Sequence, residues 1–175
     1  RCDERLGLRD GRDLHDGRLV SRSADTVLAA QDLILRFWAV VDEVDDTPGA
    51  DLFTDGGALV IESFRAEGAE ELGRYFAARR KLSAERQRST RHLCTNLRVL
   101  SGEGIRLAAT ITVFSGTGAR PLPLEAPSSL ADFTFDCMET PDGWRFREVR
   151  GTLVFAGTDT PDLKNAALAA KGVSA

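Results

Sequence analysis

Asp42 is a carboxylate that the helical pattern places on the apolar side of its own segment. Residues 25–43 read DTVLAAQDLILRFWAVVDE, and at about 100° per residue their large apolar side chains share one broad face. Asp42 falls on that face beside Leu35 and Trp38. A carboxylate that faces a core is costly unless something pairs with it, and such groups gather at functional sites. The face consists of Val27, Leu28, Ile34, Leu35, Trp38 and Val41.

His92 is the second side chain suited to chemistry, because an imidazole can act as an acid or a base near neutral pH. It lies in RHLCTNLRVL, which reads as a strand. A single histidine on a strand is often structural, and Asp42 could instead bind a nearby turn or pair with Arg91. The residues alone leave these alternatives open.

Length and composition restrict the class of protein. The 175 residues suit one domain, 42% of them are hydrophobic, and the net charge is −4. This mild acidity argues against a nucleic-acid binder, and no apolar run reaches the roughly 20 residues of a membrane span. The basic residues between Arg79 and Arg91 are therefore expected to form a solvated face. Three widely spaced cysteines suggest neither a disulfide framework nor a zinc site, so we expect a cytoplasmic protein.

The predicted elements segregate along the chain. A helix is expected from about Asp25 to Asp45, with Ser23 or Asp25 as its cap, followed by a strand over 58–64 and a helix from Gly68 to about Leu82. Long alternating strands follow, and Pro141-Asp142-Gly143 predicts a tight hairpin turn. Such segregation favours an α+β fold in which one curved antiparallel sheet wraps around helices as a cone.

Four segments resemble a known family when they are taken in order: FWAVVDEVDD, ADLFTDGGALVIE, STRHLCTNLRV and ETPDGWRFREV. Together they resemble the SnoaL-like branch of the nuclear transport factor 2-like superfamily, which includes polyketide cyclases, scytalone dehydratase and ketosteroid isomerase. The resemblance covers about residues 25–155. It implies a cone-shaped α+β barrel with an internal apolar pocket. We accordingly expect an arm at 1–22, the domain at 23–157 and a tail or lid helix at 158–175.

The resemblance to scytalone dehydratase implies an acid/base dyad of Asp42 and His92. That enzyme also uses a second histidine and two tyrosines, whereas this chain has ITVFSG in the corresponding region, Val41 before the aspartate and Ser63 near the other tyrosine position. The substrate of the dehydratase is therefore not carried over. A dyad of this kind suits elimination of water, enolisation, or an aldol-type or oxa-Michael ring closure.

Further candidates come from periodicity and from the family. Asp132 is a reserve acid on a late strand, and Asn96 shares the face of His92 by period two unless it forms a sheet bulge. The remaining candidates for substrate binding are Trp38, Phe53, Tyr75, Phe76, Thr112 and Phe135. The chain shows no ligand cluster, phosphate loop or nucleophile elbow, so neither a metal nor a cofactor is expected.

The expected function is a cofactor-independent cyclase, dehydratase or isomerase that acts on a hydrophobic small molecule, such as an intermediate of secondary metabolism. The alternative is a non-catalytic binding or assembly module resembling the small subunit of a ring-hydroxylating dioxygenase. An epoxide hydrolase built on Asp132 and Arg106 is a third reading. A homodimer is expected through the alternating Thr/Arg face of residues 104–114, and the loop 116–129 is expected at the pocket mouth or the interface.

Overall fold

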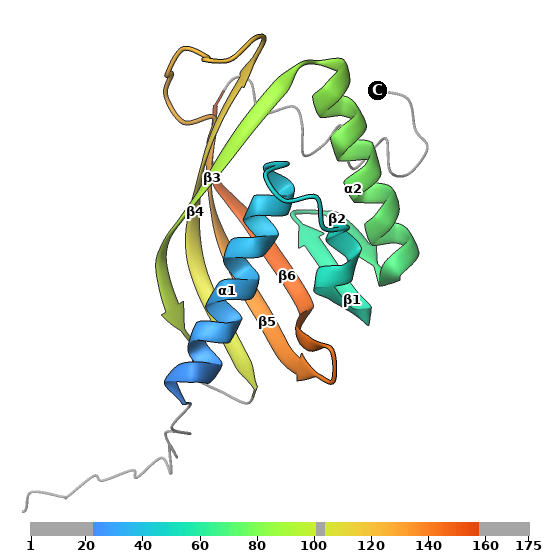
Figure 1. Ribbon diagram of the computed structural model, residues 1–175. Helices are drawn as coiled ribbons and strands as arrows, with labels where there is room; N and C mark the ends of the chain where they lie inside the picture. The colour runs from blue at the N-terminus through green and yellow to red at the C-terminus, as the bar shows by residue number, and fades with distance from the viewer. Residues whose placement is uncertain (1–22, 101–103, 158–175) are drawn as a thin grey trace, which may run out of the picture.

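The computed structural model describes residues 23–100 and 104–157 (Figure 1). The expected arm at 1–22 and the lid helix at 158–175 lie outside the described residues. The described chain folds into two α-helices, a short 3-10 helix and one six-stranded sheet. In chain order the elements are α1 (Ala24–Val41), η1 (Gly49–Leu52), β1 (Phe53–Ile61), β2 (Phe64–Glu67), α2 (Gly68–Glu85), β3 (Arg88–Val99), β4 (Ile105–Thr117), β5 (Ser129–Thr140) and β6 (Gly143–Ala156).

The sheet is mixed and open, with the strand order β2-β1-β6-β5-β4-β3. The long strands from β3 to β6 pair antiparallel in sequence, and β1 joins them through a parallel pairing with β6. The α+β architecture is thus confirmed, and so is the hairpin after Thr140. The expected strand over 58–64 is wrong in its bounds, because β1 already begins at Phe53 and the chain turns back at Ile61 into β2.

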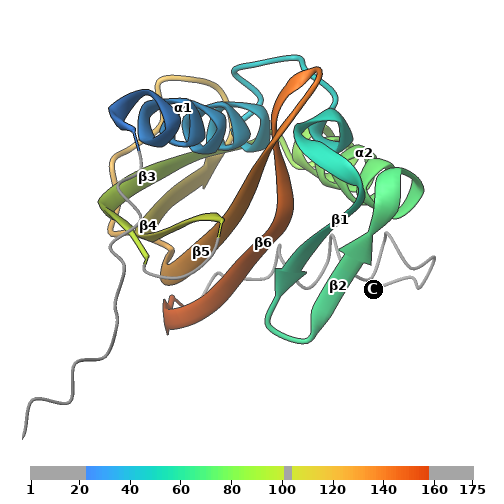
Figure 2. The same ribbon diagram turned by 90° about the horizontal axis from the view of Figure 1, so that it is seen from below.

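The sheet curves, and both helices lie on the same side of it (Figure 2). Register shifts at Thr95/Arg98, Leu130/Ala131 and Asp136/Cys137 mark bulges, which bend a strand and increase its local twist. The inner side chains of the long strands pack against α1 and form the core. Among the described residues, no helix combines the length and the apolar character needed to cross a bilayer.

The buried face of α1 is narrower than the sequence pattern suggests. Ser23 caps the helix as expected, because its hydroxyl accepts a hydrogen bond from the Thr26 backbone N–H at 3.1 Å. Leu28 and Leu35, which lie seven residues apart along one edge of the apolar stripe, are 60% and 52% exposed. Their predicted place in the core is therefore wrong. The buried residues of α1 are Ala30, Leu33, Ile34, Phe37, Trp38, Val40 and Val41.

Aromatic rings at the centre of the core join α1 to the sheet. The ring centroid of Phe146 on β6 lies 5.6 Å from that of Phe37, 5.4 Å from that of Phe53 and 5.9 Å from that of Phe135. Phe146 has no exposed surface. These ring contacts fix the distance between α1 and the sheet.

Replacement of Phe146 by Ala should lower the free energy of unfolding by about 3–5 kcal/mol, because it removes buried surface and leaves a cavity between α1 and the sheet. Phe155→Ala on the same strand is the matched control, since Phe155 is 67% exposed and its loss should change stability by less than about 0.5 kcal/mol. Chemical denaturation followed by circular dichroism measures both. Equal losses in the two variants would contradict this account of the core.

Candidate active site

The end of α1 determines where Asp42 lies. The Glu43 backbone N–H donates to Val40 O at 3.1 Å and the Val44 N–H donates to Ala39 O at 2.9 Å, while Glu43 takes a φ of 56°. This pair of bonds is the Schellman arrangement that ends many helices. The helix therefore stops at Val41, four residues before the expected end, and Asp42 is its C-cap. Its carboxylate extends from the helix end toward β3.

Two residues of β3 donate to this carboxylate. The Thr90 hydroxyl donates to Asp42 Oδ1 at 2.7 Å, and the His92 backbone N–H donates to Oδ2 at 2.8 Å. His92 Nδ1 lies 2.6 Å from Oδ1. The side chains of His92 and Asp42 are only 9% and 6% exposed. Of the alternatives left open by the sequence, pairing of the Asp42 carboxylate with the Arg91 side chain is not observed. Arg91 Nη1 donates to the Thr90 backbone carbonyl at 2.6 Å and reaches only the backbone carbonyl of Asp42, at 3.5 Å.

The environment of the pair favours an ionised aspartate and a neutral histidine. Burial alone would raise the pKa of Asp42, but hydrogen bonds and charge from His92, with the Thr90 hydroxyl, lower that pKa below its usual value. Burial lowers the pKa of His92, and the charges of Arg79 and Arg88 act in the same direction while Asp42 opposes them. Because the carboxylate can only accept, His92 Nδ1 carries the proton. In the described part of the chain no hydrogen bond reaches Nε2, which is left as a base.

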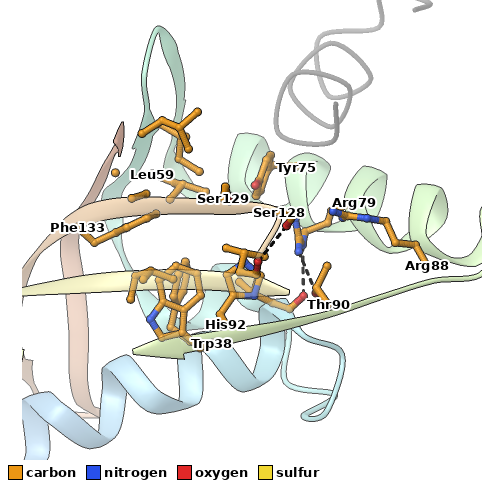
Figure 3. A pocket seen from close by; sticks show the side chains of 18 residues that line it. Trp38, Leu59, Tyr75, Arg79, Arg88, Thr90, His92, Ser128, Ser129 and Phe133 are labelled. Atoms are coloured by element: carbon orange, nitrogen blue, oxygen red, sulfur yellow. Dashed lines mark hydrogen bonds between the residues drawn. The ribbon is translucent and has the colours of Figure 1, made fainter. Parts of the chain in front are cut away.

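His92 faces an apolar pocket between α1, α2 and the sheet (Figure 3). The pocket has a volume of about 760 Å³, including the open space at its mouth. Trp38 stacks on the imidazole, with ring centroids 4.7 Å apart and planes 14° apart. The lining residues are Phe37, Trp38, Val41, Leu59, Ile61, Tyr75, Arg79, Arg88, Thr90, His92, Ile111, Val113, Ser128, Ser129, Ala131, Phe133, Gly151 and Leu153.

Gly151 on β6 allows Phe133 to shape the pocket wall. The Phe133 ring packs directly on the Gly151 backbone, and a Cβ at this position would overlap the ring. Both residues line the pocket. A larger residue at position 151 would therefore displace Phe133, and the shape of the pocket depends on this glycine.

Arg79 is a residue of the pocket that the sequence analysis assigned to a solvated face, and that assignment is wrong. It is only 8% exposed and lines the pocket from α2. Its Nε donates to Val41 O at 3.3 Å and its Nη2 to Thr90 Oγ1 at 3.5 Å. Leu72, Tyr75, Phe76 and Arg79 follow the i, i+3, i+4, i+7 spacing of one helix face. That spacing could have identified it.

Thr90 is a second residue beside the dyad that the sequence did not single out. It connects Arg79 to Asp42, because its hydroxyl accepts from the first and donates to the second. It also precedes His92 by two residues on β3, so it shares the inner face of the strand. Because side chains alternate between the two faces of a strand, counting back two residues from His92 would have identified Thr90.

The expected substrate-binding aromatics divide between the pocket and the core. Trp38 and Tyr75 line the pocket. Phe53, Phe76 and Phe135 do not; Phe53 and Phe135 are buried in the aromatic core, and Phe76 packs against it. These three side chains therefore contribute to the core and not to the pocket wall.

Three other candidates lie on the outer face of the sheet, away from the pocket. A bulge after Thr95 turns Asn96 to a φ of 53°, so Asn96 lies in an outer groove with Asp132 instead of sharing the face of His92. Asp132 accepts a hydrogen bond from the Thr110 hydroxyl at 3.2 Å and is exposed. Thr112 pairs with Leu93 and Leu130 in an outer row. The homodimer expected through this face stays a prediction.

Within residues 23–100 and 104–157, no group of three or more histidine, cysteine, aspartate or glutamate side chains could hold a metal ion. Of the two cysteines in these ranges, Cys137 is buried, and burial raises its pKa to about 12, while Cys94 is half-buried. Neither thiol is poised as a nucleophile.

The chain belongs to the family of SnoaL-like domains, whose family model matches residues 22–150. The match covers all of α1 and continues through β3 to Arg150 on β6, so it includes Asp42, Arg79 and His92. A search of curated proteins found no match.

Solved structures share the fold at low sequence identity. A protein of unknown function with a cystatin-like fold from Nostoc punctiforme is 20% identical, with a TM-score of 0.63 over 78% of this chain and 96% of that one. A nuclear transport factor 2-like protein from Novosphingobium aromaticivorans is 16% identical, with a TM-score of 0.60 over 81% and 88%. ActVI-ORFA from Streptomyces coelicolor is 14% identical, with a TM-score of 0.61 over 77% and 100%.

The proton on His92 can be located by nuclear magnetic resonance of the imidazole nitrogens. We expect the Nδ1–H tautomer and a pKa below the ordinary 6.5, because burial and two arginine charges disfavour the charged ring. The unfolded chain then binds this proton more readily than the folded chain, so the stability that neutral His92 contributes is present above pH 6.5 and is lost as the pH falls through the folded pKa.

Asp42→Asn should lower the pKa of His92 further, because the substitution removes the one charge that raises it. A His92→Gln spectrum separates the signals of His92 from those of His15. A higher pKa in Asp42→Asn, or the Nε2–H tautomer in the unsubstituted protein, would contradict this electrostatic account.

Proposed function

We propose that the protein is a cofactor-independent acid/base enzyme of the cyclase, dehydratase or isomerase type, and that it acts on a hydrophobic small molecule such as a secondary-metabolite intermediate. The observation that carries the proposal is the hydrogen bond between Asp42 and a histidine that faces a largely apolar pocket. Membership of the SnoaL-like family supports a small-molecule pocket at this place in the fold.

In the proposed reaction His92 Nε2 removes a proton from a carbon next to a substrate carbonyl. The electron pair of the broken C–H bond moves to the carbonyl oxygen and forms an enolate. Asp42 stabilises the resulting imidazolium through Nδ1–H, and Trp38 stacks on it, which also favours the cation. His92 can then return the proton to another carbon of the delocalised enolate, which completes an isomerisation. In a dehydration the enolate re-forms its carbonyl, the bond from the β-carbon to its hydroxyl breaks, and the imidazolium protonates the departing hydroxyl, which leaves as water. In an aldol-type ring closure the enolate carbon bonds to a second carbonyl carbon of the substrate, and the imidazolium protonates the resulting alkoxide.

A proton-exchange assay tests this role without the natural substrate. The protein is incubated in D2O with α-tetralone, and deuterium uptake next to the carbonyl is followed by mass spectrometry; a β-hydroxy aryl ketone reports loss of water by absorbance. We expect His92→Ala and Asp42→Asn each to reduce the catalysed rate at least about a hundredfold, because positioned proton transfer contributes roughly 10²–10⁴-fold.

Asp45→Asn is the matched control, because Asp45 follows the same helix end but binds Thr47 and does not line the pocket. It should keep the full rate. Near-normal rates in both dyad variants, or exchange no faster than in buffer with the unsubstituted protein, would contradict the acid/base proposal. Tight binding of these ketones without exchange would indicate the non-catalytic binding module instead.

A further inference from the structure

Arg79 places a positive charge inside an apolar pocket, and no carboxylate of the described residues pairs with it directly. Its polar contacts in the described residues are the Val41 carbonyl, the Thr90 hydroxyl and the Tyr75 hydroxyl, all of them neutral. Across the described ranges no carboxylate forms an ion pair with it, and Asp42 connects to it only through Thr90. A buried guanidinium without a counter-ion is costly, because burial removes its hydration.

The contacts of Arg79 are also long for hydrogen bonds. Donor–acceptor distances of 3.3 and 3.5 Å exceed the usual 2.7–3.2 Å for N–H groups. A guanidinium has five N–H groups in a planar fork, so it retains capacity for a stronger acceptor. Figure 3 shows the Arg79 side chain reaching from α2 toward Thr90 and His92, among the side chains that line the pocket.

We propose that Arg79 is the binding residue for a carboxylate on the substrate, so that the enzyme acts on hydrophobic carboxylic acids. The inference rests on the proposed function, since it names the substrate class of the same pocket. A carboxylate matches one planar guanidinium in charge and in geometry. Arg88, Ser128 and Ser129 add further polar side chains to the lining of this pocket.

This placement also orients the substrate toward the base. The Arg79 charge is close enough to His92 to act on its pKa, so the anchor and the base share one region of the pocket. With its carboxylate at Arg79, the apolar body of the substrate extends over Leu59, Ile111 and Phe133. The reacting carbon then lies near His92, because the contact between the carboxylate and Arg79 fixes the orientation of the substrate.

Binding of two isosteric probes tests the anchor without any turnover. β-Naphthoate carries a carboxylate and β-naphthamide is its neutral counterpart, and isothermal titration calorimetry gives both dissociation constants. We expect the unsubstituted protein to bind the carboxylate at least about tenfold more tightly, as a charge-assisted bond in a buried site permits. Arg79→Gln should abolish the preference and Arg79→Lys should retain part of it. Arg80→Gln, a change at the exposed neighbouring arginine, should leave it intact.

A second measurement keeps the test decisive if Arg79→Gln fails to fold. The pKa of β-naphthoic acid labelled with 13C in its carboxyl group should fall when it binds the unsubstituted protein, because a guanidinium favours the anion. An apolar pocket alone would raise that pKa. Equal affinity for the two probes, a preference that persists in Arg79→Gln, or a raised carboxyl pKa would each overturn the proposal.

The dyad variants separate this proposal from the proposed function. His92→Ala and Asp42→Asn should both keep the preference for the carboxylate probe, and Asp42→Asn should strengthen it because a neighbouring negative charge is lost. Loss of exchange in these variants without any carboxylate preference in the unsubstituted protein would reject the Arg79 anchor alone. A preference that depends on Arg79, with normal exchange in both dyad variants, would reject the acid/base dyad alone.

Discussion

A buried carboxylate at the end of α1 must be satisfied, and much of the site follows from how this fold satisfies it. Asp42 is 8% exposed and cannot donate, so every donor has to come from neighbouring elements. The Thr90 hydroxyl, the His92 backbone N–H and the His92 ring supply three. An unsatisfied buried group of this kind would cost about 1–3 kcal/mol or more, so the carboxylate fixes the helix end against β3.

Two backbone features make this contact geometrically available. The Schellman arrangement stops α1 at Val41, and Gln87, with a φ of 50°, turns the chain from α2 into β3. The end of α1 and the start of β3 meet at Asp42. Thr90 and His92 lie two residues apart on the inner face of β3, so both can donate to this carboxylate. The pocket lies where α1, α2 and the sheet come together, which brings Arg79 of α2 to the same place.

The sequence was sufficient to predict those features that depend only on neighbouring residues in the chain. The α+β class, the two helices and the hairpin after Thr140 were predictable, because periodicity and turn residues encode them directly. The family was predictable from the resemblance of four segments taken in order. Asp42 and His92 were identified as candidates from type, face and family resemblance, but their hydrogen bond depends on how a helix end meets a strand far along the chain. Asn96 shows the limit of period two, because a bulge reverses its face. The sequence left that bulge open as the alternative, and asparagine tolerates the positive φ it requires, but alternation alone could not decide between the two.

Arg79 was missed for a different reason. Arginines cluster after it, and a charge run usually marks a solvated face, so composition outweighed the helix spacing that places Arg79 on the apolar face of α2. A long side chain can follow that face and still bring its charged head to a polar end of the pocket. Asp132 is the opposite case, because it was expected in the site and lies outside it. Alternating polar and apolar residues identify a strand, but they do not tell which face of the strand borders a cavity, and Asp132 lies in an outer groove.

Burial and the charges around His92 determine its protonation state before a reaction begins. Burial and the two arginines favour the neutral ring, while Asp42 favours the imidazolium, and the first group prevails. A histidine held neutral with Nδ1–H toward Asp42 begins a cycle as a base at Nε2. Once it accepts a proton, the nearby carboxylate and the Trp38 ring limit the energy of the cation, so the proton can be returned. An anionic substrate group would partly neutralise the arginine charge and raise the basicity of the ring when the substrate is bound. Pairing of Arg79 with a substrate carboxylate would thus weaken one of the influences that lower the pKa of His92, while burial, the largest of them, would still act.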